Sequence, residues 1–280
     1  MSSGEIILLG AIAGLTIFLG LPVGRIRGLS AMWRAVLNAG AAGVLVFLLV
    51  ETVSKGFEPV EVTVDDHEWS KFLVRGPVFV AAFAVGLLGL VYYDRWTKSR
   101  AQASRSSLGP GAAAVAEFGT AGRVASLSEP KRIALFIALG IGMHNFAEGL
   151  AIGQSAKSGA VSLAVLLVIG FALHNATEGF GIVAPLTSEQ EVPSWGFLFA
   201  MGCIAGLPTF VGTIVGQAWT SEILMIAFLA LAGGSILYVI VQLMRVAAKL
   251  DHDQMHVMWG LFAGVLLGLG TELILAAAGL

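Results

Sequence analysis

The sequence predicts an all-α polytopic membrane protein with eight transmembrane helices in a bundle. Of its 280 residues, 57% are hydrophobic and only 12% are charged, too few polar side chains to coat a soluble globule of this length. Apolar runs of about 20 residues, enough to cross roughly 30 Å of hydrocarbon as a helix, recur along the chain. These runs are too long for barrel strands and lack period-two alternation, so helices are expected to satisfy the backbone in lipid.

Eight such runs can be counted, with short polar or charged breaks between them. The first run has no basic residue ahead of it and no small-residue cleavage site in a polar region behind it. We therefore interpret it as a transmembrane helix and not as a signal peptide. The predicted helices lie at approximately 5–24, 32–54, 73–93, 132–153, 160–184, 195–217, 221–248 and 256–278.

Two of the breaks between predicted helices are long enough to be informative. Residues 94–130 are rich in Ala, Ser and Gly, which predicts a flexible cytoplasmic loop between helices one to three and helices four to eight. All eight helices are expected to form a single transmembrane domain, 1–280. Residues 58–70 form an acidic break that contains His67. This break could concentrate cations, but a solvated loop is the favoured interpretation.

Glycine and cysteine usage both fit a helical membrane protein. The 36 glycines lie inside the apolar runs as much as between them, which favours close packing of helices in lipid. Soluble helices would not tolerate glycine at this frequency. The single cysteine, Cys203, lies inside an apolar run, so a disulfide or a thiolate cluster is excluded and a packing role is expected.

The distribution of Lys and Arg predicts the orientation, because cytoplasmic loops retain basic residues. Odd-numbered breaks hold twelve basic residues and even-numbered breaks hold four, while the fifth break has only acidic residues, Glu189 and Glu191. Both termini are therefore expected outside the cytoplasm, in an integral protein of the cell membrane. The twelve are Arg25, Arg27, Arg34, Arg95, Lys98, Arg100, Arg105, Arg123, Lys131, Arg132, Arg245 and Lys249; the four are Lys55, Lys71, Arg75 and Lys157.

The sharpest feature of the sequence is the pattern His-Asn-x-x-Glu-Gly, which occurs twice, 30 residues apart. The fourth predicted helix reads GIGMHNFAEGLAIG and the fifth reads GFALHNATEGFGI. In each copy the His and the Glu are spaced i,i+4, which places both side chains on one helix face, and the Asn lies about 100° around the helix. One face can thus offer an imidazole, a carboxylate and an adjacent amide. The six residues are His144, Asn145, Glu148, His174, Asn175 and Glu178.

The expected depth of these motifs favours a metal site. Residues 154–158 form a very short turn, so the two helices are expected to run antiparallel with both motifs near their midpoints. A carboxylate at that depth costs about 2.5 kcal/mol or more, which a shared cation would offset. Two imidazoles and two carboxylates make a four-ligand shell for zinc or another borderline first-row metal. The alternative is hydrogen bonding across the helix pair. Gly149 and Gly179 would let neighbouring helices approach closely.

Other polar groups in or near the apolar runs are weaker signals. His252 and His256, with Asp251 and Asp253, have the spacing of a weak metal exit site on the cytoplasmic side, but a solvated helix start is the favoured interpretation. Four further residues are interpreted as helix–helix hydrogen-bonding or interfacial groups and not as ligands: Glu51, Gln217, Gln242 and Glu272.

At the two motifs, the sequence resembles the ZIP family (Zrt/Irt-like proteins) of divalent metal transporters, whose fourth and fifth helices carry HNxxEG-type motifs. The resemblance spans essentially the whole chain, with eight helices, both ends outside and a long cytoplasmic loop after helix three. It implies that His144, Glu148, His174 and Glu178 form the primary transport site. Asn145 and Asn175, sharing the two glutamates, would contribute to an adjacent second site.

The chain departs from the family pattern at several positions. Family members often have proline before the motif glutamate, where this chain has Ala147 and Thr177, so the proline kinks of these helices are expected to be softened. In helix six the family usually has a glutamate immediately before a proline, and here Leu207 stands before Pro208. A commonly acidic position in helix seven aligns loosely with Gln242, and the cytoplasmic loop has no histidine. The resemblance thus implies an intact primary site and a depleted second one.

The resemblance implies transport of zinc, iron, manganese or cadmium into the cytoplasm, with the metal as cargo and no catalytic cofactor. No Gly-rich phosphate loop with Lys and Ser/Thr occurs in the sequence. Two alternatives stay open. An intramembrane zinc hydrolase would use the same ligands, although HExxH is missing and four symmetric ligands suggest a closed cage. A metal sensor without flux fits the lost acid in helix six. The expected partners are the metal ion and the lipid bilayer, with a homodimer as an option and no nucleic acid.

Overall fold

The computed structural model describes residues 2–107, 127–157, 161–188, 191–219 and 221–277, and every element in these ranges is helical. The predicted all-α membrane fold is confirmed. Six of the described helical segments are long and apolar enough to cross a membrane. The α-helices are α1 (Ser3–Leu15), α2 (Ala31–Asp65), α3 (Trp69–Ser107), α6 (Glu129–Lys157), α7 (Val161–Val183), α8 (Trp195–Ala218), α9 (Glu222–Leu250) and α10 (Gln254–Ala277), with short 3₁₀ helices η1 (Thr16–Leu19), η2 (Leu21–Arg25) and η3 (Ala184–Ser188).

Two predicted loops are largely helical. The acidic break at 58–70 was expected as a solvated loop, but α2 continues to Asp65 and α3 begins at Trp69. The reason is a buried stripe along α2 formed by Gly56, Val60 and Thr63, whose spacing follows the helix period and anchors the extension. The flexible loop expected at 94–130 is also shorter, because α3 extends to Ser107. Residues 108–126 of that expected loop lie outside the described part of the chain.

The eight α-helices of the described residues form two groups of four. Group one contains α1, α6, α7 and α8, and group two contains α2, α3, α9 and α10. Glycines bring helices into backbone contact inside each group. A Cβ added at Gly206 would lie 2.4 Å from the carbonyl oxygen of Gly14, and one added at Gly264 would lie 1.9 Å from that of Gly40. Among the described glycines, every such backbone approach closer than 3.0 Å falls within a group. The seam between the groups is therefore packed through side chains.

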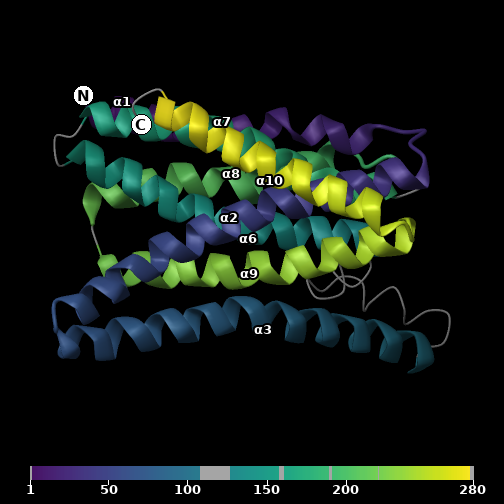
Figure 1. Ribbon diagram of the computed structural model, residues 1–280, viewed down its shortest axis with the longest axis horizontal. Coiled ribbons are helices and arrows are strands. Elements are labelled where there is room, and N and C mark those ends of the chain that lie inside the picture. Colours follow the sequence, from purple (N-terminus) through teal and green to yellow (C-terminus); the bar gives the residue numbers. More distant parts are fainter. Residues whose placement is uncertain (1, 108–126, 158–160, 189–190, 220, 278–280) are drawn as a thin grey trace.

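The seam is centred on α6. Its most apolar stretch is 78% buried, against 6% for that of α3, which lies at the edge of the bundle (Figure 1). The α6 helix packs across the seam against α9, with the rings of Phe146 and Phe228 4.6 Å apart. Most side chains in this stretch of α6 are thus held away from lipid.

The two termini lie at the same end of the bundle, and α3 ends at the opposite one (Figure 1). Consecutive helices run antiparallel along the long axis of the molecule. The connection at 66–68 lies at the end that carries the termini. Which side of the membrane this end of the bundle faces stays a prediction.

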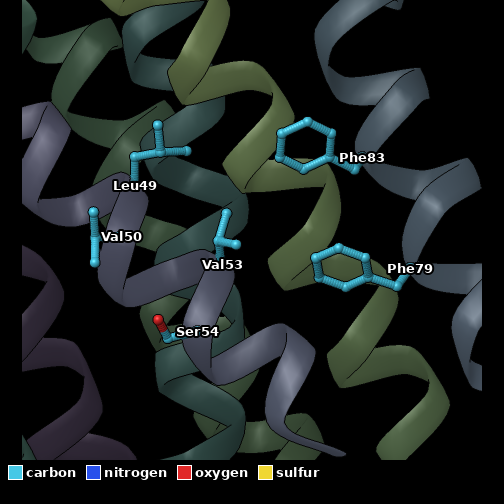
Figure 2. Close-up of a pocket in the computed structure, with 6 residues that line it drawn as sticks. All are labelled: Leu49, Val50, Val53, Ser54, Phe79 and Phe83. Atoms are coloured by element: carbon cyan, nitrogen blue, oxygen red, sulfur yellow. The ribbon is translucent and has the colours of Figure 1, made fainter. Parts of the chain in front are cut away.

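The peripheral helix α3 leaves an open crevice against α2. The crevice has a volume of about 430 Å³. Figure 2 shows Phe79 and Phe83 of α3 pointing toward α2 across it. The lining is apolar apart from Ser54, as expected for a surface at the level of the hydrocarbon. The other lining residues are Leu49, Val50 and Val53.

A buried ion pair ties α3 to α6 across the seam. The Nε atom of Arg132 lies 2.7 Å from Oδ1 of Asp94, and the side chains are only 10% and 12% exposed. The hydroxyl of Tyr238 on α9 also hydrogen-bonds Asp94. Three helices from both groups therefore meet at one carboxylate.

Removing this carboxylate is expected to destabilise the bundle. Asp94→Ala leaves the Arg132 guanidinium buried without its counter-charge, a change that typically costs about 3–5 kcal/mol. Thermal unfolding in detergent measures the effect. The double variant Asp94→Leu with Arg132→Met removes both charges and is expected to recover most of the loss. An unfolding temperature of Asp94→Ala equal to that of the wild type would contradict this prediction.

Candidate metal site

The motif on α6 brings its histidine and glutamate together as predicted. His144 is fully buried and Glu148 is 4% exposed. Nε2 of His144 lies 3.1 Å from Oε1 of Glu148, one helical turn away. Within the described residues, Oε2 of Glu148 has no hydrogen-bond donor. An imidazole and a carboxylate are therefore presented side by side in the middle of the bundle.

The motif on α7 is buried to the same degree. Asn175 and Glu178 are both 0% exposed, and α7 packs against α6. The side chain of His174 lies outside the described part of the structure. Among the described side chains, no three of the types His, Cys, Asp and Glu are grouped closely enough to hold a metal. The four-residue shell thus remains a prediction, of which the described geometry provides the His144–Glu148 pair.

The two motif asparagines have matching roles. Nδ2 of Asn145 donates to the carbonyl oxygen of Ala205 on α8 at 3.0 Å, and Nδ2 of Asn175 donates to that of Ala13 on α1 at 2.9 Å. Each amide is thereby oriented with its oxygen directed away from that carbonyl. In the described structure both Oδ1 atoms are buried and accept no hydrogen bond. Among the described residues, each motif therefore has a buried amide oxygen without a donor, on the residue three positions before its glutamate.

Each asparagine contacts its neighbouring helix close to a feature that removes backbone hydrogen bonds, the end of α1 or the proline of α8. The carbonyl oxygen of Ala13 also accepts a hydrogen bond from Oγ1 of Thr16 at 2.6 Å, where α1 gives way to the 3₁₀ helix η1. Ala205 lies three residues before Pro208, which has no N–H and interrupts the hydrogen-bond ladder of α8. On α1 the acceptor thus lies at the helix end, and on α8 it lies one residue after Ile204, whose carbonyl loses its i,i+4 donor to Pro208.

The two motif glycines set the distance to the neighbouring backbones, as the sequence predicted. A Cβ on Gly149 would lie 2.2 Å from the carbonyl oxygen of Thr209 on α8. A Cβ on Gly179 would lie 2.0 Å from that of Ile17 in η1. Because only glycine fits at these two positions, α8 and η1 are held against the helices that carry the motifs.

The sequence did not identify Thr52 as part of the site. This residue on α2 is 0% exposed, and its Oγ1 lies 3.0 Å from Nδ1 of His144. The sequence carried little signal for it, because threonine in a membrane helix commonly bonds to its own backbone. His144 thus has a close polar neighbour on each side of the seam, with Glu148 3.1 Å from Nε2 on its own helix and the Thr52 hydroxyl hydrogen-bonded at Nδ1 on α2.

Comparison with known sequence families shows to which family the protein belongs. The profile of the ZIP zinc transporter family matches residues 61–276, most of the chain and both motifs. The chain belongs to this family. A search of curated proteins found no significant match. Membership shows that this ZIP protein transports divalent metal ions across a membrane.

This ZIP protein places Leu207 away from the site. Leu207 is 49% exposed on the outer face of α8, whereas Thr209 is fully buried. The residue at the position that the resemblance assigned to an acid therefore does not face the motif on α6. The predicted depletion of a second site stays a prediction.

A lysine of the ZIP protein lies close to the α6 motif. Lys55 on α2 forms an ion pair with Glu51 one turn earlier, and its Nζ lies 5.8 Å from the ring centroid of Phe171 on α7. Its ammonium also interacts electrostatically with Glu148 and Glu272. Glu51, which the sequence suggested as a helix–helix hydrogen-bonding or interfacial residue, thus forms an ion pair with Lys55 of its own helix.

The acidic and histidine cluster before α10 forms a helix start. Oδ1 of Asp253 accepts the backbone N–H of Met255 at 2.9 Å, and Nδ1 of His256 lies 2.9 Å from Oδ2 of Asp251. The backbone N–H of Asp253, followed by the His256 side chain, lowers the pKa of Asp251 by hydrogen bonding to its carboxylate. These contacts match the favoured sequence interpretation.

Proposed function

We propose that this ZIP protein carries zinc into the cytoplasm through a site on α6 and α7 formed by His144, Glu148, His174 and Glu178. Iron and manganese are the next candidates, because the same nitrogen and oxygen donors accept them. The observation that carries the proposal is the burial of two motif carboxylates, Glu148 and Glu178, inside a helical membrane domain. Carboxylates at such depth mark ion pathways, since a passing cation offsets the cost of burying them.

The nature of the donors favours a transition metal over a hard cation. An imidazole nitrogen beside a carboxylate suits zinc, iron and manganese, whereas calcium and magnesium take oxygen ligands. The buried amide oxygens of Asn145 and Asn175 support a contribution to the passage of the ion next to the glutamates. At the position on α8 where the resemblance implied an acid, this protein has Leu207, whose side chain is exposed and cannot bind a metal. We therefore favour the passage of one metal ion at a time.

The seam between the two helix groups supports a route for release. His144 and Glu148 lie on group one, and Thr52 and Lys55, which contact or face them, lie on group two. The two groups meet through side chains and not through close backbone contacts. A movement of one group relative to the other can therefore expose the site. The positive-inside distribution supports entry from the side of the termini and exit toward the cytoplasm.

Flux itself tests the proposal. Purified protein in liposomes that contain a zinc indicator is expected to give saturable zinc uptake that protein-free liposomes lack. Iron and manganese added outside are expected to compete, while calcium and magnesium are not, because of the donor set. Zinc binding without uptake would support a sensor, and zinc-dependent hydrolysis of added peptide or lipid without uptake would support a hydrolase. Either result would contradict transport.

A further inference from the structure

His144 has two close polar contacts at the seam, one within α6 and one to α2. Oε1 of Glu148 lies at an ion-pair distance of 3.1 Å from Nε2 of His144, and Nδ1 of His144 is hydrogen-bonded to Oγ1 of Thr52 at 3.0 Å. Thr52 and His144 are both fully buried, and Glu148 is 4% exposed. The imidazole is therefore held between a carboxylate of its own helix and a hydroxyl of α2.

These two contacts determine which ring nitrogen carries the proton when His144 is neutral in the metal-free protein. A neutral imidazole has one N–H donor and one nitrogen acceptor. An ionised carboxylate can only accept, so beside one at 3.1 Å the proton of the neutral ring lies on Nε2. Nδ1 then presents its lone pair to Thr52, whose hydroxyl donates to it.

A metal ion at this site requires the other tautomer. A cation bound to Nε2 uses the lone pair of that nitrogen, so the proton of the neutral ring must lie on Nδ1. The ring stays neutral, because the proton lost at Nε2 is matched by one gained at Nδ1. The N–H at Nδ1 now needs an acceptor, and Oγ1 of Thr52 is already within hydrogen-bond distance. A hydroxyl can fill both roles because it rotates and offers a donor and two lone pairs.

We propose that Thr52 is a positioning residue of the metal site, whose hydroxyl donates to His144 in the metal-free protein and accepts from it once metal is bound. This inference rests on the proposed function of His144 as a ligand. Without the hydroxyl, the metal-bound state has a buried N–H with no partner. An orphaned N–H is less well tolerated than an orphaned acceptor, so the loss falls mainly on the bound state.

Two substitutions at Thr52 test the inference in purified, detergent-solubilised protein. Thr52→Val keeps the branched shape and removes the hydroxyl, and it is expected to raise the zinc dissociation constant about 10-fold or more. Thr52→Ser keeps the hydroxyl and is expected to bind close to the wild-type value. Competition with a zinc-chelating indicator gives the constants.

A matched control is available on the same helix. Thr63 is also 0% exposed, but its Oγ1 donates to the backbone carbonyl oxygen of Val60 at 2.6 Å. Thr63→Val is expected to leave zinc affinity unchanged. Unchanged affinity in Thr52→Val, or equal losses in Thr52→Val and Thr52→Ser, would overturn the role of the hydroxyl while leaving the proposed function intact. A wild-type protein that binds no zinc would overturn both.

A measurement on the wild-type protein does not depend on the folding of any variant. In protein with ¹⁵N-labelled histidine, the shifts of the two His144 ring nitrogens report which one carries the proton. We expect the proton on Nε2 without zinc and on Nδ1 with zinc. A ring protonated on both nitrogens before zinc binding, or a proton on Nδ1 in both states, would overturn the proposed exchange.

Discussion

Zinc uptake is expected to fall by more than about 100-fold when Glu148 or Glu178 is replaced by glutamine. Loss of a group that merely orients a metal ligand costs roughly 10–100-fold, so loss of a charged ligand is expected to cost more. Glutamine keeps the size of the side chain and removes the charge that attracts the cation. Initial rates of zinc uptake into liposomes, normalised to the amount of folded protein, measure the effect.

The matched control for this pair is Glu61→Gln. Glu61 lies on an exposed face of α2 near the membrane surface, so its charge is solvated and its loss is expected to leave uptake nearly unchanged. Undiminished flux in both motif variants would rule out the proposed route. A loss in only one of them would show that the α6 and α7 motifs do not act as a single site.

The second large effect is expected on stability, from Gly149→Ala. The added Cβ would lie 2.2 Å from the carbonyl oxygen of Thr209 and 2.9 Å from the N atom of Thr213. Backbone atoms cannot rotate aside as a side chain end can, so α6 and α8 must separate along their contact. Overpacking typically costs about 1–3 kcal/mol, and a clash with backbone on a buried helix is expected to reach or exceed the upper value. Thermal unfolding in detergent, followed by light scattering for monodispersity, checks this.

Gly181→Ala provides the comparison on α7. A Cβ at Gly181 would meet nothing within 4 Å, so the same chemical change occurs in a membrane helix without a clash. Alanine also favours the helix over glycine by up to about 1 kcal/mol. This variant is expected to be at least as stable as the wild type. Equal stability of Gly149→Ala and Gly181→Ala would show that the α6–α8 contact is looser than described.

The sequence predicted the helices well but not where each of them ends. Apolar runs mark the part of a helix that lies in lipid, and they say nothing of turns that continue into water. The extension of α2 to Asp65 depends on a buried stripe at Gly56, Val60 and Thr63, which becomes visible only once the neighbouring helices are known. Likewise, the change of α1 into η1 at Thr16 occurs inside an apolar run that gives no sign of it.

The sequence predicted the His144–Glu148 pair at the centre of the candidate site, but not the residues of other helices that contact the site. The spacing of His144 and Glu148 fixes their proximity, because i,i+4 is a local property of any helix. Thr52 comes from a helix far away in sequence, and its role depends on packing across the seam. The amide orientation of Asn145 also depends on a distant partner, the carbonyl of Ala205. A periodic pattern cannot show which helix will supply such a partner.

The placement of both termini at one end of the bundle has a practical consequence for reconstitution (Figure 1). Membrane proteins usually enter vesicles in both directions, and opposed populations blur any assay of vectorial flux. An affinity tag at either terminus of this chain reaches the same compartment. Intact vesicles retained by an affinity resin would then share one insertion direction. Comparing the retained and unretained fractions would show from which face the ion departs.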